Sequence, residues 1–361
     1  MITVGIIGAS FARDAYLPAF RHIDGAKVVA LASGRLASAQ AAAAPHGITA
    51  VYDDWQRMLD EHAPDLVCIA TPTNLHKPMT LAAVAAGAHV LCEKPTAMNA
   101  TEARAMLEAA EAAGRVHMID HELRFNPNRA RIAAMIADGA LGEIRHVNIA
   151  NIGASWNDPA SRPMGDWWSD AAQGGGRLGA NGSHQVDMLR WWLGEPTAVV
   201  GQALTRVPDR VDPKTGQAWT ATADDLSYFT LEMASGALAR VFMSGVAATN
   251  MGNETQVFGS KGTLTLSNGD ERLWFAKAGE KGFTEITETD PNASLAGLNK
   301  GIWNVSVLSA LRELVGAITE GRPLRQGATF LDGLRNQQVL DAVLASTRSR
   351  RWETLPAGDA A

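Results

Sequence analysis

The 361-residue sequence has few cysteines, no excess of positive charge and no long apolar run. Its two cysteines, Cys68 and Cys92, lie in short apolar stretches, which indicates buried thiols and excludes a disulfide framework. The formal net charge of −6 and the lack of a basic cluster argue against nucleic acid or an anionic membrane surface as partner. No apolar stretch is long enough for a bilayer, and we expect no signal peptide, so the predicted location is the cytoplasm.

Strands and helices alternate from Ile2 to Asp120, which predicts a doubly wound parallel sheet of the α/β class. We assign residues 1–122 to a dinucleotide-binding Rossmann domain. After it, runs of strands without intervening helices predict a large, mostly antiparallel open sheet. Residues 123–361 are therefore assigned to a substrate-binding and oligomerisation domain of α/β type. Its last helix, predicted over Phe330–Ala345, is a candidate to pack back on the first domain.

The first predicted strand ends at Gly8, a turn with Ser10, Phe11 and Ala12 follows, and a helical pattern then runs through Tyr16, Leu17 and Phe20. A strand, a tight turn and a helix in this order form the place where a dinucleotide pyrophosphate meets a helix N-terminus. Only the first glycine of the G-x-G-x-x-G pattern is present, since Ser10 and Arg13 occupy the other two glycine positions. The turn is therefore a candidate coenzyme site that keeps one of the three glycines of the pattern.

The second predicted strand ends at Ser33, and Arg35 follows two residues later. Proteins that bind NAD place an acidic residue here to bind the ribose hydroxyls. A hydroxyl and a guanidinium in its place suit a 2′-phosphate. The sequence thus favours NADP as the cofactor, with NAD as the alternative.

The end of the fourth predicted strand carries polar residues. The strand Leu66–Ala70 runs into a loop with Thr71, Pro72, Asn74 and His76, which we predict to lie near the nicotinamide.

The strand His89–Cys92 ends in Glu93 and Lys94, followed by Pro95. A proline after Lys94 favours an extended conformation, which would aim the side chain into the crevice at the strand ends. We expect Glu93 either to point away from Lys94 or to orient it. A surface ion pair is the alternative interpretation.

The second domain contains a glycine-rich stretch, 174–176, followed by Gly182, Ser183, His184 and Asp187. His184 and Asp187 are three residues apart on a predicted helix, so both side chains can face one pocket. A helix-surface pair is the alternative. No third ligand has suitable spacing, so we expect no metal site.

Ten tryptophans are present, and several cluster in the irregular segment 153–176 and the following helix. Indole rings pack against the apolar faces of sugar rings, which makes Trp156, Trp167 and Trp168 candidates for substrate contact, with core packing as the alternative. For Trp192 we predict core packing.

These motifs resemble the family of glucose–fructose oxidoreductase and inositol dehydrogenase (Gfo/Idh/MocA). The resemblance rests on the Gly8 turn, Ala70-Thr71-Pro72 with His76, Glu93-Lys94-Pro95, and His184 with Asp187, in that order. It implies proton transfer by Lys94 and His184, substrate binding by Asp187, and a position for His121 near the nicotinamide and the substrate. It also implies that the open sheet serves association, so we expect a homodimer or homotetramer.

The sequence departs from the family at two places. An aspartate often found four residues before the family histidine is Ala180 here, and a Trp-Arg pair is replaced by Trp167-Trp168. Arg162 is a candidate replacement for that arginine, and Arg124 is a further candidate for substrate binding. These departures concern the substrate more than the coenzyme.

The resemblance implies an enzyme, an NAD(P)-dependent dehydrogenase or reductase that transfers a hydride between its coenzyme and a hydroxyl or carbonyl group of a sugar, cyclitol or related polyol. Two alternatives remain open. One is an NAD-dependent glycosidase or deglycosylase that works through a transient keto-sugar. The other is a nucleotide-binding sensor without turnover.

Overall fold

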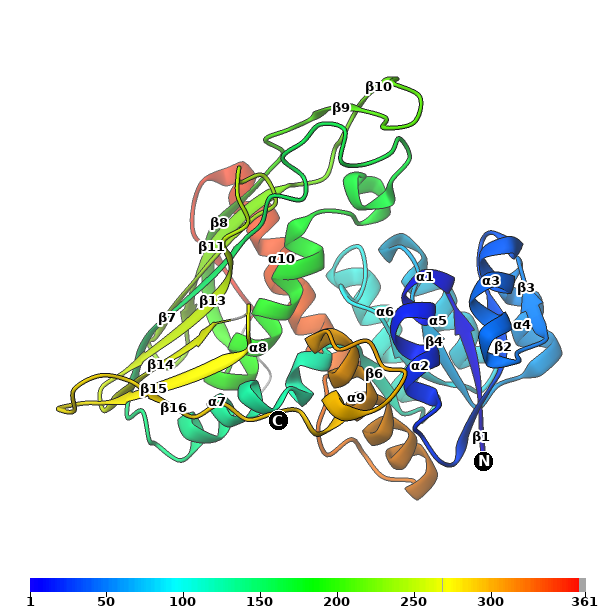
Figure 1. Ribbon diagram of the computed structural model, residues 1–361, viewed down its shortest axis with the longest axis horizontal. Coiled ribbons are helices and arrows are strands. Elements are labelled where there is room, and N and C mark those ends of the chain that lie inside the picture. The colour runs from blue at the N-terminus through cyan, green and yellow to red at the C-terminus, as the bar shows by residue number, and fades with distance from the viewer. Residues whose placement is uncertain (268, 357–361) are drawn as a thin grey trace. The chain divides into compact units, whose positions relative to one another are not determined.

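The computed structural model describes residues 1–267 and 269–356 and divides into two compact units (Figure 1). The first unit holds Met1–Asn126 together with Asp290–Leu334, and the second holds Pro127–Thr289 and the chain from Arg335 onward. The sequence places a single division after residue 122, whereas the first unit also takes in the segment Asp290–Leu334. That segment joins the first unit because the apolar side chains of its long helix, α9 (Ile302–Glu320), complete one of the cores of that unit.

A six-stranded sheet forms the centre of the first unit, with the order β3-β2-β1-β4-β5-β6 and every pair parallel. This arrangement confirms the predicted doubly wound sheet. Its strand order reverses between β1 and β4, where ligands bind at the carboxyl ends of the strands. The strands are β1 (Ile2–Ile7), β2 (Ala26–Ala32), β3 (Ala50–Tyr52), β4 (Leu66–Ile69), β5 (His89–Cys92) and β6 (His117–Ile119).

Apolar cores cover both faces of this sheet because alternate strand residues point to opposite faces. Val4 and Ile6 lie in one core with α9, and Ile7 and Val67 lie in the other. Cys68 and Cys92 are free and buried in separate cores, which confirms the predicted buried thiols. The α-helices of this unit, besides α9, are α1 (Ala9–Phe11), α2 (Leu17–Phe20), α3 (Leu36–Ala43), α4 (Trp55–His62), α5 (His76–Ala85) and α6 (Ala100–Ala112).

Short 3-10 and π-helical turns complete this unit, and the π-helical turn η1 joins α1 to α2 into one helical run. The turns are η1 (Ala12–Tyr16), η2 (Ala44–His46), η3 (Thr73–Leu75), η4 (Glu122–Phe125) and η8 (Pro291–Ser294).

A nine-stranded sheet forms the second unit, with the order β16-β15-β14-β13-β7-β12-β11-β8-β17. Its pairs are antiparallel except β7 with β12, so the prediction of a mostly antiparallel sheet is confirmed. The strands are β7 (Ile144–Ile152), β8 (Pro196–Leu204), β11 (Leu226–Met233), β12 (Leu238–Ser244), β13 (Gly252–Gly259), β14 (Gly262–Ser267), β15 (Arg272–Lys277), β16 (Thr284–Glu285) and β17 (Glu353–Thr354). A separate pair, β9 (Asp209–Val211) and β10 (Ala218–Thr220), was not predicted.

Helices α7 (Pro127–Ala137), α8 (Ser183–Leu193) and α10 (Phe330–Ser349) lie on one side of the large sheet (Figure 1). The turns η5 (Trp167–Ser169), η6 (Ala171–Gln173) and η7 (Leu178–Gly182) precede α8. The opposite face of β12 exposes Leu238, Arg240 and Phe242 in strict alternation with buried residues. Among the described helices, none combines the length and the apolar character that crossing a bilayer requires.

Candidate active site

The turn after β1 is built around Gly8. Its φ of 111° lies in the region that favours glycine, and an added Cβ would overlap the carbonyl oxygen of Ala70 at the end of β4. Its amide donates to Ala32 O at the end of β2, at 2.8 Å. The helical run that starts at Ala9 therefore has its amino end at the carboxyl edge of the sheet, where a pyrophosphate fits. Ser10, Phe11 and Ala12 lie in the first turn of this run, which begins closer to Gly8 than the sequence pattern indicates.

Ser33 and Arg35 lie at the carboxyl end of β2, next to β1 in the sheet. The Ser33 amide donates to Tyr52 O at 3.0 Å, which fixes the start of this loop. Arg35 is exposed and has the extended backbone of an N-cap residue before α3. An exposed guanidinium at this position can reach a ligand without breaking a described ion pair.

His76 connects the loop after β4 to the loop after β5. Its Nδ1 lies 3.0 Å from Pro95 O and its Nε2 lies 2.9 Å from Thr71 O. The ring is buried, and this burial lowers the pKa of His76. Pro72 is half-buried and Asn74 is exposed in the same loop. The structure thus places His76 between the loops that follow β4 and β5, within hydrogen-bond distance of a carbonyl oxygen in each.

Lys94 directly follows β5, is half-buried, and is joined to Pro95 by a cis peptide bond. Glu93 is turned inward: its Oε1 accepts from the Tyr16 hydroxyl at 3.0 Å, and its Oε2 accepts from the Lys94 amide at 3.2 Å. Of the two expected arrangements, the structure therefore favours a Glu93 carboxyl that holds the backbone of Lys94.

Asp120 directly follows β6, and the Tyr16 hydroxyl also lies 2.9 Å from its Oδ2. Tyr16, Glu93 and Asp120 are all buried. Burial raises the pKa of all three groups, and the mutual repulsion of the two carboxylates adds to the increase for Asp120.

His121 and Arg124 follow Asp120 and are both buried. Arg124 forms an ion pair with Asp332 at 3.1 Å and donates to Gly327 O at 3.0 Å. The structure thus places Arg124 in a contact that holds the loop before α10, while its role in substrate binding stays a prediction.

In the second unit, His184 and Asp187 are buried on the first turns of α8, which continues the π-helical turn η7. Asp187 Oδ1 accepts from Asn336 Nδ2 of α10 at 3.0 Å, and Asn336 Oδ1 accepts from Arg190 at 2.7 Å. The Asp187 carboxylate is therefore held in place by two helices. Trp192 is buried and donates to Arg129 O at 3.2 Å, which confirms its predicted place in the core.

The predicted aromatic residues divide into two groups. Trp156 is buried, with the guanidinium carbons of Arg162 and Arg177 at 5.3 and 5.7 Å from its ring centroid. Arg162 is also paired with Asp166 at 2.7 Å. Cations thus occupy the surroundings of the Trp156 ring.

Trp167 and Trp168 pack against each other with ring centroids 4.3 Å apart, and both are half-buried. Both rings are thus partly exposed, and their contact with a substrate stays a prediction.

Three residues of these networks escaped the sequence analysis. Tyr16 resembled any apolar position of a helix, and Asn336 carried no signal. Asp120 did carry one, because an acidic residue directly after a parallel strand lies at the ligand edge of a sheet.

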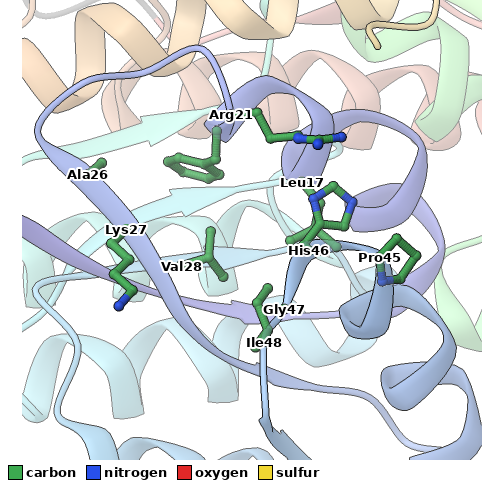
Figure 2. Close-up of a pocket in the computed structure, with 10 residues that line it drawn as sticks. Leu17, Arg21, Ala26, Lys27, Val28, Pro45, His46, Gly47 and Ile48 are labelled. Atoms are coloured by element: carbon green, nitrogen blue, oxygen red, sulfur yellow. The ribbon is translucent and has the colours of Figure 1, made fainter.

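A cavity of about 300 Å³ lies elsewhere on the first unit (Figure 2). It lies at the amino end of β2, between α2 and the segment 45–48, and Arg21, Lys27 and His46 line it. None of the predicted site residues lines this cavity. The described residues also contain no group of three His, Cys, Asp or Glu side chains placed to hold a metal ion.

The parallel sheet, the close turn at Gly8 and the lysine at the end of β5 define a nicotinamide-dependent oxidoreductase. The chain belongs to the Gfo/Idh/MocA family. Residues 2–121 match the oxidoreductase family with an NAD-binding Rossmann fold, and residues 130–265 match the GFO/IDH/MocA C-terminal domain. These matches confirm the resemblance inferred from the motifs.

Several known proteins are similar to this chain. An uncharacterized oxidoreductase of Rhizobium meliloti is 30% identical over 74% of this chain and 75% of its own length. Levoglucosan dehydrogenase of Pseudarthrobacter phenanthrenivorans is 26% identical over 98% of each chain.

Solved structures agree over nearly the whole chain. An oxidoreductase domain protein from Kribbella flavida gives a TM-score of 0.88 at 30% identity over 99% of each chain. A levoglucosan dehydrogenase in complex with NADH and levoglucosan gives a TM-score of 0.88 at 25% identity, over 99% of this chain and 100% of that one.

Proposed function

We propose that this oxidoreductase transfers a hydride between a nicotinamide coenzyme and a hydroxyl or carbonyl carbon of a sugar, cyclitol or related polyol. The observation that carries the proposal is Lys94 at the carboxyl end of β5, with its backbone held by Glu93 and with His76 between the adjacent loops. The sugar substrate of the similar levoglucosan dehydrogenase supports this substrate class.

Each residue has a distinct part in this proposal. The bound coenzyme accepts or supplies the hydride. Lys94 accepts the hydroxyl proton during oxidation and returns it during reduction, and His184 is a second proton-transfer group. Asp187 binds a substrate hydroxyl, and its hydrogen bond to Asn336 supports this role by fixing the carboxylate before substrate arrives.

We further propose NADP as the preferred coenzyme. Ser33 and the exposed Arg35 at the end of β2 support this preference, because they offer a hydroxyl and a positive charge to a 2′-phosphate.

Association into a homo-oligomer through the open sheet is part of the same proposal. The outer face of β11 and β12 carries Tyr228 and Phe242, each 37% exposed, and Leu238, which is 47% exposed. Tyr228 and Phe242 form an exposed aromatic pair, which supports contact with a second copy of the chain, while Arg240 separates Leu238 from that pair. The cytoplasmic location stays a prediction, which the free thiols Cys68 and Cys92 support.

The test is incubation of the purified protein with NADP or NAD and a panel of sugars, anhydrosugars and cyclitols. A stoichiometric rise in the near-ultraviolet absorbance of reduced nicotinamide, with the matching ketone as product, is the expected result. Cleavage of a glycoside without a net absorbance change would favour the glycosidase alternative. Coenzyme binding without turnover on any member of the panel would favour the sensor.

A further inference from the structure

Tyr16, Glu93 and Asp120 form a buried cluster whose hydrogen bonds can be counted. The tyrosine oxygen lies 3.0 Å from Glu93 Oε1 and 2.9 Å from Asp120 Oδ2. A tyrosine hydroxyl has one proton and can donate to only one of two carboxylates. The second short contact requires a proton on the other carboxyl group, because two lone pairs would otherwise face each other in a buried place. The geometry therefore requires one carboxyl proton in the cluster.

The surroundings of the two carboxyl groups differ. Glu93 Oε2 accepts the Lys94 amide, and the positive charge of Lys94 favours the ionised form of Glu93. Asp120 is 1% exposed, and its carboxyl group also forms a hydrogen bond with that of Glu93, which two ionised carboxylates could not form. An ionised Asp120 in that position would be costly, whereas a protonated one is tolerated. The proton therefore belongs on Asp120, with Glu93 and Tyr16 as its hydrogen-bond partners.

Other titratable groups near the cluster reinforce this assignment. Glu122 adds negative charge beside Asp120, and burial raises the pKa of the thiols Cys68 and Cys92, which keeps them neutral. Lys94 is the positive charge that acts on Glu93. Simultaneous negative charges on Glu93 and Asp120 are therefore disfavoured, whereas a single negative charge on Glu93 is balanced by Lys94.

We propose that the cluster of Tyr16, Glu93 and Asp120 holds a single carboxyl proton, on Asp120, and that ionised Glu93 is a positioning residue that holds the backbone of Lys94. The second half of this statement rests on the proposed function, since it requires Lys94 to be the group that exchanges the substrate proton. In that exchange the proton passes from the hydroxyl to the Lys94 amine. No net charge is created in the cluster itself, because Asp120 keeps its proton throughout.

The first experiment uses infrared difference spectroscopy on the coenzyme-free protein at neutral pH. The spectrum of the wild type minus that of Asp120→Asn should contain the carbonyl stretch of a protonated carboxylic acid. Asp224 requires a control, because burial raises the pKa of its carboxyl to about 7. Asp224→Asn should remove a different band and leave that of Asp120 in place. A difference spectrum for Asp120→Asn that contains only carboxylate bands would overturn the proposal.

If Asp120→Asn does not fold, Tyr16→Phe answers the same question. Removal of the hydroxyl takes away one of the hydrogen-bond partners of the Asp120 carboxyl group, so the carboxylic acid band should shift in frequency. A band at the wild-type frequency in folded Tyr16→Phe would count against the cluster.

The second experiment tests Glu93 as a positioning residue. Glu93→Ala removes the acceptor of the Lys94 amide, so kcat should fall, whereas Glu93→Gln keeps an acceptor oxygen and should restore most of the loss. Equal losses of kcat in both folded variants would overturn this half of the proposal. Absence of turnover by the wild type on every sugar would defeat only the proposed function, since the infrared result does not need turnover.

Discussion

Gly8 and Ala70 approach each other across the β1–β4 pair so closely that a Cβ on Gly8 would overlap the Ala70 carbonyl oxygen. Gly8→Ala should therefore lower the free energy of unfolding by at least about 1–3 kcal/mol, since φ is also 111° there. It should also weaken coenzyme binding, because the turn that presents the helix amino end must move. Denaturant unfolding and fluorescence titration with NADPH measure the two effects.

Gly269→Ala is the matched control, because nothing lies within 4 Å of its added Cβ. We expect its stability to stay within about 1 kcal/mol of the wild type and its coenzyme affinity to be unchanged. Equal losses in both variants would mean that the turn at Gly8 has no special role.

Lys94→Ala should lower kcat by about 10²–10⁴-fold, the usual contribution of a general acid–base group. Coenzyme affinity should change much less, because the turn at Gly8 and the loop at Ser33 are untouched. Lys94→Arg should restore little, since a guanidinium stays protonated. His184→Ala should also lower turnover, and the double variant should lose less than the product of the two effects if both groups act on one proton.

Lys77→Ala on α5 serves as the control, because Lys77 is a partly exposed lysine whose charge lies 4.0 Å from Glu102. Its steady-state kinetics should match the wild type. A folded Lys94→Ala protein with near-normal kcat would show that the Glu93-Lys94-Pro95 stretch is structural, and we would then abandon the proposed role of Lys94.

The sequence was sufficient for those parts of the fold that depend on local pattern. The alternating threonines and leucines of β14 are visible as a period-two pattern, and the uniformly buried β4 is visible as a continuous apolar stretch. The three-residue strands β9 and β10 are too short to give such a pattern. The parallel pairing of β7 with β12 depends on contacts between segments far apart in the chain, which no local pattern encodes.

The candidate site, too, could be predicted from the sequence only in part. Lys94 and His76 could be predicted because each follows a recognisable strand in a motif. Their supporting partners could not, because the contacts are distant in sequence: Tyr16 is 77 residues from Glu93 and 104 from Asp120. Asn336 is likewise 149 residues from Asp187. Which carboxyl groups are buried together, and so share a proton, is a property of the folded chain alone.

Phe242→Arg should dissociate the proposed oligomer, because it places a charge in the exposed face where the Phe242 ring lies 6.1 Å from that of Tyr228. Light scattering coupled to gel filtration would report the mass. Leu36→Arg is the control, since Leu36 is 39% exposed on α3, which belongs to the first unit and not to the unit that contains the large sheet. An unchanged mass for Phe242→Arg, or a monomeric wild type, would contradict association through this face.

His117 should make the protein less stable in acid. Its Nδ1 accepts the Phe330 amide at 3.0 Å, which requires an unprotonated nitrogen, and burial lowers the pKa of His117 to about 4. The unfolded chain binds this proton near pH ~6.5. The contribution of His117 to stability is therefore fully present above that pH and falls by up to about 3 kcal/mol as the pH drops to about 4.

Unfolding measured between these two pH values should show a smaller slope for His117→Phe than for the wild type. His89 also has a pKa lowered by burial, so some slope should persist in the variant. Identical slopes for both proteins would show that His117 does not stay neutral in the folded state.

Arg35→Asp should reverse the coenzyme preference. In the wild type we expect tighter binding of NADPH than of NADH, because Arg35 can form a charge-assisted hydrogen bond with the 2′-phosphate. Such a bond contributes roughly 1.5–3 kcal/mol, so the variant should lose about 10–100-fold in NADPH affinity. It should bind NADH at least as well as before, since an aspartate at this strand end can accept hydrogen bonds from the ribose hydroxyls.

The control is Arg104→Asp on the exposed side of α6, which makes the same charge change away from β2 and should leave both affinities unchanged. Tighter binding of NADH than of NADPH by the wild type would refute the NADP preference while leaving the role of Lys94 intact, because the adenosine and nicotinamide ends of the coenzyme are bound by different strand ends.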